Sequence, residues 1–246
     1  MIKKVVQEKT VQKVVLARKT TLTFPSVLNP LALLHLLYKK RKNSTIFLIQ
    51  FSKEKAFLGA TPERLYKREK NVVVVDALAG TFSKKNVLDP TTLFSHTKEK
   101  EEFLFVKTGI EQTLSPLCRK LEWEKEDTLL ETPYLYHFHN QLRALLKKPL
   151  SDQTLLSMLH PTAAIGGFPQ KEALHFLQNY EPFKRGYYAA PLGWIDSKKT
   201  ELFIGIRSAL IENNLLHLYA GAGIVKNSEP EKEWNELESK IYNFLG

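Results

Sequence analysis

The sequence predicts an α+β fold in one domain covering residues 1–246. Segments typical of strands occur in groups, and segments with helical periodicity lie between the groups, without the strict alternation that builds a doubly wound sheet. No linker rich in Pro, Ser or Gly divides the chain, and 43% hydrophobic residues among 246 are enough for a substantial core. We therefore expect a single α+β domain with neighbouring antiparallel strands.

The first third of the chain is predicted to be mainly strand. Residues 5–24 are rich in Val and Thr and predict a strand or helix-edge segment that leads into a strand. An Asn-Pro step opens residues 29–42, which end in a basic turn and therefore predict a helix. The remaining strands of this part are predicted at 45–52, 56–67 and 71–81.

The rest of the chain combines helices with three more strands. Residues 97–121 have apolar residues at three- and four-residue steps, which predicts a helix. Residues 142–159 also predict a helix, with a break at Pro149. The further elements expected are a loop at 160–170, a helix at 170–181, strands at 186–196, 201–212 and 215–225, and a closing helix at 228–245.

The composition excludes several classes of protein. The formal charge of +10 comes from 36 Lys and Arg that are scattered along the chain, which suits attraction of a small polyanion, and no nucleic-acid-binding motif is present. Cys118 is the only cysteine, so neither a disulfide framework nor a cysteine-rich zinc site can form. The apolar runs are too short to span a bilayer, and no signal peptide is recognisable. We expect a cytoplasmic monomer or weak homodimer that binds neither nucleic acid nor membrane.

Charged residues of the closing helix lie beside its apolar stripe. The stripe consists of Trp234, Leu237, Ile241, Phe244 and Leu245. Glu233, Glu236 and Lys240 occupy an arc of roughly 60° next to it. One interpretation is a surface ion pair between Glu236 and Lys240, worth about 0.2–0.5 kcal/mol. The other is that these charged side chains face the interior.

The predicted helix that starts near residue 97 repeats this arrangement. Glu99 lies within its apolar arc and Glu102 at the edge of that arc. Two helices that each turn a Glu-x-x-Glu pair toward the core bring up to four carboxylates together, and burying them is costly unless a cation neutralises them. An all-oxygen site of this kind suits Mg²⁺ completed by an anionic substrate. The pattern therefore predicts a Mg²⁺ site formed by Glu99, Glu102, Glu233 and Glu236.

A series of short motifs runs along nearly the whole chain. The motifs are KVVLAR (13–18), GATPERL (59–65), ALAGT (77–81), HPTAAIGG (160–167), RGYYAAPLGW (185–194), IRSALI (206–211), LYAGAGIV (218–225) and SEPEKEWNELESK (228–240). Together and in this order they resemble the chorismate-binding enzymes, and within them the isochorismate synthases of menaquinone and siderophore pathways. The resemblance implies an α+β fold of the anthranilate synthase component I type, with layered antiparallel or mixed sheets and flanking helices, that binds chorismate through Mg²⁺. Family members usually carry a further N-terminal region, most of which we expect this chain to lack.

The resemblance also implies catalytic roles for two residues. Isochorismate forms from chorismate when water adds at C2 and the C4 hydroxyl leaves with migration of the double bonds. Lys13 matches the base that deprotonates the water, and a lysine acts so only where burial or nearby cations favour its neutral amine. Glu63 matches the acid that protonates the departing hydroxyl, so its pKa should be raised by a pocket of low dielectric. The alternatives are an exposed lysine and a turn glutamate paired with Arg64.

The other residues implied by the resemblance surround the metal and the substrate. The four glutamates match the magnesium-sphere glutamates of the family, with Glu102 and Glu236 expected closest to the ion. Arg207 would bind the enolpyruvyl carboxylate through its paired donors, and Lys240 would add a second positive contact. Backbone N–H groups near Gly221 and Gly223 would approach carboxylate oxygens, unless these glycines only form a bend. The further substrate-binding residues expected are Ala79, Gly80, Thr81, His160, Thr162, Ala164, Tyr219 and Ala222.

A few positions distinguish members of this family. Enzymes that add nitrogen tend to carry Thr-Leu where this chain has Ala164 and Ile165, and aminodeoxychorismate synthases typically have a lysine where it has Ala79. The expected nucleophile is therefore water, and the expected enzyme a Mg²⁺-dependent isochorismate synthase. One alternative is a salicylate synthase, which would also eliminate pyruvate. The other is a degenerate chorismate-binding protein without turnover, an alternative prompted by Phe103, which stands where a histidine is frequent.

Overall fold

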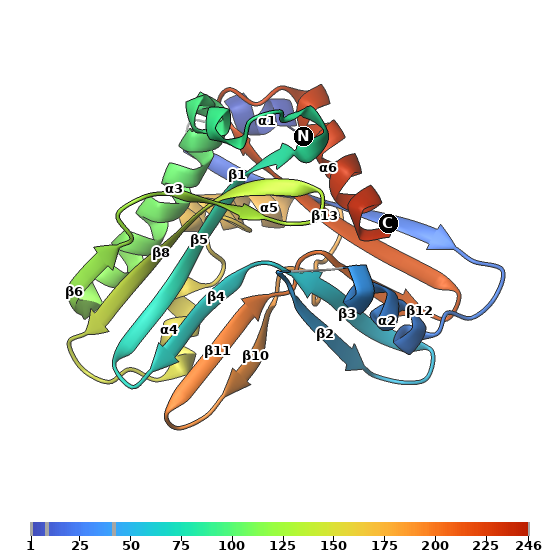
Figure 1. The fold of residues 1–246 in the computed structure, drawn as a ribbon, viewed down its shortest axis with the longest axis horizontal. Helices are drawn as coiled ribbons and strands as arrows, with labels where there is room; N and C mark the ends of the chain where they lie inside the picture. Colours follow the sequence, from blue (N-terminus) through green and yellow to red (C-terminus); the bar gives the residue numbers. More distant parts are fainter. Residues whose placement is uncertain (1, 8–9, 41–42, 246) are drawn as a thin grey trace.

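The chain folds into two antiparallel sheets that lie at an angle to each other, like the sides of an inverted V (Figure 1). The computed structural model describes residues 2–7, 10–40 and 43–245. Every strand pair among these residues is antiparallel. Helices flank the sheets, so the α+β class and the layered architecture predicted from the sequence are confirmed.

The first sheet has the strand order β2-β3-β12-β13-β1-β9. Its long pair, β1 and β13, stays in register from Lys13 opposite Val225 to Thr23 opposite Leu215. Helices α5 and α6 pack against this pair, and α2 packs against β2 and β3. The bounds are α1 Ile2–Gln7, β1 Lys13–Thr23, α2 Pro30–Lys40, β2 Thr45–Gln50, β3 Lys55–Thr61, β9 Gly167–Phe168, α5 Gln170–Tyr180, β12 Ser208–Glu212, β13 Leu215–Val225 and α6 Pro230–Leu245. The last two residues of the helix predicted at 29–42 lie outside the described residues.

The second sheet has the order β10-β11-β4-β5-β8-β6, and β7 also pairs with β8. Helix α3 crosses β5 and shares a core with it, because its periodic residues Phe103, Val106, Ile110 and Leu114 are buried. The bounds are β4 Arg64–Glu69, β5 Val72–Ser83, α3 Thr97–Leu114, β6 Cys118–Trp123, β7 Thr128–Glu131, β8 Leu135–Leu146, α4 Asp152–Leu159, β10 Pro191–Ile195 and β11 Lys199–Ile204. None of the helices in the described ranges has both the length and the apolar character needed to cross a membrane.

Helix α6 buries the apolar stripe predicted for it. Leu237, Ile241 and Phe244 belong to the core under the first sheet, whereas Trp234 is half-exposed beneath the Arg18 guanidinium, 4.5 Å from its ring centroid. The side chain of Leu245 lies outside the part that is described. Glu233 is only 1% exposed, so the interpretation that charges of this helix face the interior is confirmed for that residue.

The chain passes from one sheet to the other at two neighbouring points. Residues 62–63 join β3 to β4, and residues 205–207 join β11 to β12. The crossings are tied together because the Ile204 N–H donates to the Glu63 carbonyl at 3.0 Å and the Ala60 N–H donates to the Arg207 carbonyl at 3.1 Å. Two residues with predicted roles, far apart in sequence, therefore meet where the sheets join.

Several predicted elements are wrong in type or extent. The strand predicted at 56–67 is two strands, β3 and β4, in different sheets, and only residues 191–195 of the strand predicted at 186–196 form a strand. The helix predicted at 97–121 ends at Leu114, and residues 118–123 form β6. The helix predicted at 142–159 is a strand up to Leu146 and a helix only from Asp152, because alternate residues of β8 face the core against β5. The strand predicted at 201–212 is two strands in different sheets, separated by Arg207, whose φ of 49° bends the chain.

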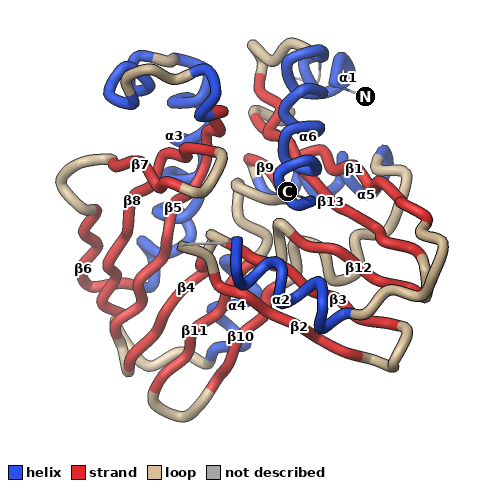
Figure 2. Tube along the Cα trace, turned by 45° about the vertical axis from the view of Figure 1, so that its right-hand side comes forward, coloured by secondary structure: helices blue, strands red, loops and turns tan. Residues whose placement is uncertain are grey.

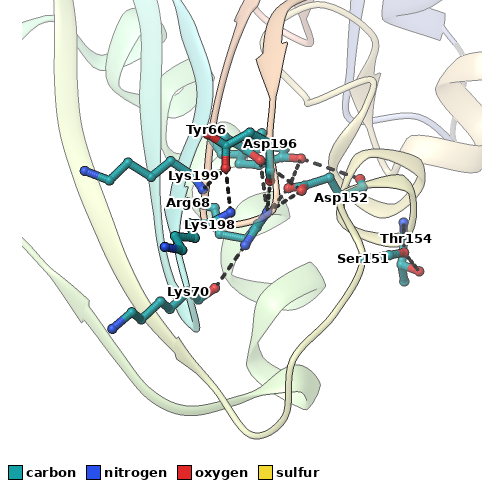
Figure 3. Close-up of polar contacts among 10 residues, drawn as sticks. Tyr66, Arg68, Lys70, Ser151, Asp152, Thr154, Asp196, Lys198 and Lys199 are labelled. Carbon is teal, nitrogen blue, oxygen red and sulfur yellow. Dashed lines mark hydrogen bonds and ion pairs between the residues drawn. The ribbon is translucent and has the colours of Figure 1, made fainter.

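A buried ion pair fixes the start of α4 to the second sheet (Figure 3). Arg68 of β4 donates from Nε to Asp152 Oδ1 at 2.8 Å and from Nη2 to Oδ2. The same carboxylate accepts from the hydroxyls of Tyr66 and Thr200 at 3.0 and 2.9 Å. These donors hold the pKa of Asp152 below its ordinary value, although burial opposes them. The pair anchors α4, which precedes the HPTAAIGG loop.

Candidate active site

A small cavity of about 70 Å³ lies where the two sheets meet. Its walls come from β5, β8, β13, α3, α6 and both crossings. Figure 2 shows α3 and β5 on one side of this region and β13 and α6 on the other. Of the residues predicted for the site, the cavity is lined by Glu63, Ala79, Gly80, Thr81, Glu102, Ala164, Arg207, Tyr219, Gly221, Gly223 and Lys240.

Glu63 is a buried carboxyl group at the first crossing, only 5% exposed. Burial raises its pKa from 4.5 to about 7, against the opposing positive charge of Lys13 and with help from the negative charge of Asp76. Arg64 pairs with Asp76 at 3.0 Å and with Glu201 at 3.4 Å. Glu63 therefore keeps a proton in about half of the molecules near pH 7 and in most of them below it.

Lys13 lies behind the cavity wall and is fully buried. Its Nζ is 3.1 Å from Oε1 of Glu102, and it has no hydrogen bond of acceptable geometry. Gly223 makes this contact possible, because a Cβ there would come 2.0 Å from Glu102 Oε1 and 2.9 Å from Lys13 Cε. The charges of Lys13, Lys98 and Lys240 hold the pKa of Glu102 below its ordinary value even though burial opposes them.

His137 of β8 is a cavity residue that the sequence analysis missed. Its Nε2 is 3.2 Å from Nη2 of Arg207, and its Nδ1 is 3.3 Å from Oγ1 of Thr81. Burial and the charges of Arg207 and Lys240 lower the pKa of His137 well below its ordinary value, so the ring is neutral. Because a guanidinium only donates, Nε2 accepts and the proton is on Nδ1. His137 thus orients Arg207.

A bulge in β5 carries the ALAGT motif into the cavity. The register with β8 shifts between Ala79 and Thr81, and Gly80 has a φ of 67°. A Cβ at Gly80 would lie 2.9 Å from the ring of Phe138 and 3.1 Å from Cβ of Glu99. The glycine therefore allows α3 to approach β5, which brings the glutamates of α3 to the site.

Strand β13 contributes four residues to the cavity wall, including Ala220. Tyr219, Gly221 and Gly223 line it, and the Tyr219 ring stacks on Tyr188 with centroids 5.2 Å apart. Ala222 points to the opposite face and joins the core with α6. Ala222 does not line the small cavity, and its role in substrate binding stays a prediction.

The HPTAAIGG loop places only part of its predicted residues in the cavity. Ala164 lines it, whereas Thr162 turns its hydroxyl to accept from the Ala164 N–H at 3.2 Å and stabilises the loop. His160 ends α4 and lines a separate cavity of about 730 Å³, with its Nε2 2.9 Å from the Ala189 carbonyl. Neither side chain lines the small cavity, because Thr162 bonds within the loop and His160 bonds the carbonyl of Ala189. Their roles in substrate binding stay predictions.

A larger cavity of about 650 Å³ adjoins the first and shares Thr81 with it. Glu99, Glu233 and Glu236 line this outer cavity. Glu102 lines the inner one. The two Glu-x-x-Glu pairs predicted from α3 and α6 therefore border adjoining spaces between these helices.

Lysine side chains partner three of these four carboxylates. The pairs are Lys13 with Glu102 at 3.1 Å, Lys98 with Glu233 at 2.6 Å and Lys240 with Glu236 at 2.5 Å. Within the described ranges, no three His, Cys, Asp or Glu side chains are grouped to hold a metal ion. The donors still fit Mg²⁺ in kind, since all are carboxylate oxygens and neither oxygen of the buried Glu233 has a hydrogen bond of acceptable geometry. A cation there would take the place of a lysine partner.

The family follows from the sequence as a whole. Residues 1–246 match the family described as chorismate binding enzyme. The chain belongs to the chorismate-binding enzyme family. The resemblance drawn from the eight motifs is thereby confirmed.

Relatives in this family are isochorismate synthases. The chloroplastic isochorismate synthase of Catharanthus roseus is 36% identical over 239 residues, which cover 95% of this chain and 41% of that protein. Isochorismate synthase MenF of Bacillus subtilis (strain 168) is 36% identical over 243 residues, or 96% of this chain and 51% of that protein. The chain thus spans about half the length of these relatives.

Solved structures agree with this family. The structure of MenF, the menaquinone-specific isochorismate synthase from Escherichia coli, matches with a TM-score of 0.90 and 33% identity over 99% of this chain and 57% of that one. Anthranilate synthase component I from Streptococcus pneumoniae TIGR4 matches with a TM-score of 0.87 at 21% identity, over 99% of this chain and 55% of that one. The fold of the anthranilate synthase component I type is confirmed.

Proposed function

We propose that this chain carries the catalytic region of a Mg²⁺-dependent isochorismate synthase, which adds water at C2 of chorismate while the C4 hydroxyl departs as water. The observation that carries the proposal is a carboxyl group with a pKa of about 7, Glu63, in one cavity with the cations Arg207 and Lys240. A proton donor beside an anion site is what the departure of a hydroxyl from a dicarboxylate requires. The names of the relatives support the same reaction.

Glu63 is the general acid of the proposed reaction. A leaving hydroxyl needs a proton, and a carboxyl whose pKa is about 7 holds one near neutral pH while remaining acidic enough to give it up. Ordinary exposed glutamates are ionised there and could not donate. After the hydroxyl has left as water, the Glu63 carboxylate is stabilised by the nearby charges of Lys13, Arg207 and Lys240.

Lys13 is the proposed general base. Its Nζ is buried next to the cavity and lacks a hydrogen bond of acceptable geometry, so it has capacity to bond an attacking water. The amine must be neutral to take a proton from that water. Once it has done so, the ammonium is stabilised by Glu102, 3.1 Å away.

Arg207 and Lys240 are the proposed carboxylate ligands. Arg207 is held by His137, which accepts its Nη2–H, and a planar guanidinium is suited to binding a carboxylate. Lys240 donates to the Gly221 carbonyl at 2.7 Å and to Glu236 at 2.5 Å, so its ammonium is fixed beside β13. Two fixed cations match the two carboxylates of chorismate.

Substrate binding requires the site to open. A cavity of about 70 Å³ is far below the roughly 300–1,000 Å³ of ordinary ligand sites. The adjoining outer cavity of about 650 Å³ provides the approach, between α3 and α6. Glu102 and Glu236 are the residues that we expect nearest to Mg²⁺, with Glu99 and Glu233 around them. The bound ion would neutralise these carboxylates together with that of the substrate ring.

Incubation of the purified protein with chorismate and Mg²⁺, followed by chromatography, tests the proposal. Isochorismate as the only product supports it, and the reaction should stop in excess chelator. Salicylate with pyruvate would identify a salicylate synthase instead. Chorismate binding without any product would identify a non-catalytic binding protein, and an aminated product with ammonium would contradict water as the nucleophile.

A further inference from the structure

Lys98 lies at the start of α3 and reaches across to α6. Its Nζ is 2.6 Å from Oε1 of Glu233, which is only 1% exposed. Although burial opposes it, the negative charges of Glu236, Glu233 and Glu102 raise the pKa of Lys98 above its ordinary value. One ammonium group therefore interacts with carboxylates of both helices.

Three of the four glutamates between the two helices have a lysine partner. Glu102, Glu233 and Glu236 each lie within ion-pair distance of one lysine, whereas Glu99 lies 3.8 Å from the His96 ring. Lys13 is fully buried, and Lys240 is held by the Gly221 carbonyl as well. Lys98 differs from both, because its side chain is 22% exposed and lines the outer cavity of about 650 Å³. Of the three, it is the lysine with room to withdraw on its flexible stem.

We propose that Lys98 is the internal counter-ion of the metal-free site and competes with Mg²⁺ for the carboxylates of α6. The inference rests on the proposed Mg²⁺-dependent function. A divalent ion bound at Glu233 and Glu236 would share its ligands with the Lys98 ammonium and repel it. Binding of Mg²⁺ therefore requires this side chain to swing into the outer cavity. The metal binds weakly until a dianionic substrate adds the negative charge that compensates for both cations.

Titration of Mg²⁺ into the substrate-free protein, followed by calorimetry, tests this competition. Lys98→Gln removes the charge and should bind Mg²⁺ at least about tenfold more tightly than the wild type. Lys98→Arg keeps the charge and should bind like the wild type, within about twofold. Lys100→Gln is the matched control, because Lys100 is exposed on the same helix and should likewise leave the affinity unchanged.

Thermal unfolding gives a second measurement that does not depend on activity. In chelator, Lys98→Gln should melt at a lower temperature than the wild type, since Glu233 is buried without its partner. Added Mg²⁺ should raise the melting temperature of this variant more than that of the wild type or Lys100→Gln. Equal shifts in all three proteins would contradict the competition.

The outcomes distinguish this inference from the proposed function. The role of Lys98 would be overturned if Lys98→Gln and the wild type bound Mg²⁺ with equal affinity. If Glu236→Gln then abolished Mg²⁺ binding in both proteins, the metal site itself would remain in place. Tighter binding in Lys98→Arg would also overturn it, because the charge is then irrelevant. No Mg²⁺ binding in any variant, with isochorismate formed in chelator, would overturn both.

Discussion

Replacement of Glu63 by Gln should make the protein more stable above neutral pH while it removes activity. Gln resembles the protonated carboxyl in shape but cannot ionise. Burial raises the pKa of Glu63 from 4.5 to about 7, and each pKa unit corresponds to 1.36 kcal/mol, so ionising Glu63 costs about 3 kcal/mol more in the folded protein than in the unfolded chain. Between pH 4.5 and about 7 the folded protein keeps a proton that the unfolded chain has lost. The stability of the wild type therefore falls as the pH rises through this window.

Urea unfolding at pH 5 and pH 8 measures the effect. Relative to the wild type, Glu63→Gln should gain about 2.5 kcal/mol between the two conditions, since a small part of the effect is already present at pH 5. Glu126→Gln, at an exposed position, should gain much less. Isochorismate formation should decline above about pH 7 in the wild type, where Glu63 loses its proton, and should fall by about 10²–10⁴ in Glu63→Gln at every pH. A stability difference that is the same at pH 5 and pH 8 would refute the raised pKa, and unchanged turnover would refute the role as acid.

Three further substitutions test other contacts. Lys13→Met leaves Glu102 buried without its partner, so it should lower the free energy of unfolding by about 3–5 kcal/mol and abolish water addition. Lys19→Met, at an exposed position on the same strand, should do neither. Similar urea midpoints for the two variants would contradict this prediction. Gly223→Ala places a Cβ 2.0 Å from Glu102 Oε1 and should reduce activity. Gly109→Ala, whose Cβ meets nothing within 3.5 Å, should not. Equal rates in the two variants would contradict the close approach of Glu102 to Gly223. Arg68→Met should cost about 3–5 kcal/mol in urea unfolding and leave the rate of the folded enzyme unchanged; a loss of rate at low temperature would argue against a purely structural pair.

Local patterns were sufficient where one face of an element is buried in a simple way. Leu237, Ile241 and Phe244 of α6 pack in one core, and the periodic residues of α3 pack in the other, so periodicity alone predicts their burial. The pattern was ambiguous at 142–146, because Leu142 and Leu146 are spaced for a helix as well as for a strand. Pairing with β5 selects the strand, and this long-range contact is not visible in a short window.

In the candidate site, too, local sequence patterns predicted some residues, and long-range contacts decided the others. The order of the motifs was enough to predict that Glu63 and Arg207 belong to one site. Their positions depend on the two points where the chain crosses between the sheets. His137 was missed because only its place opposite Thr81 on β5 brings it into the cavity. His160, Thr162 and Ala222 belong to matching motifs but do not line the small cavity. His160 bonds the distant Ala189 carbonyl, Thr162 bonds within its loop, and Ala222 joins the core with α6.

The amino-acid sequence by itself determined the α+β class, the motifs of the family and the presence of two helices with glutamates beside their apolar faces, because each depends on residue type and local spacing. Only the tertiary structure decided which group stands next to which carboxylate. Lys98 and Glu233, or Lys13 and Glu102, are far apart in sequence and meet only after both sheets and both helices have packed. Electrostatic interaction depends on distance and burial, so the charge balance of this site and the pKa of Glu63 are properties of the folded chain.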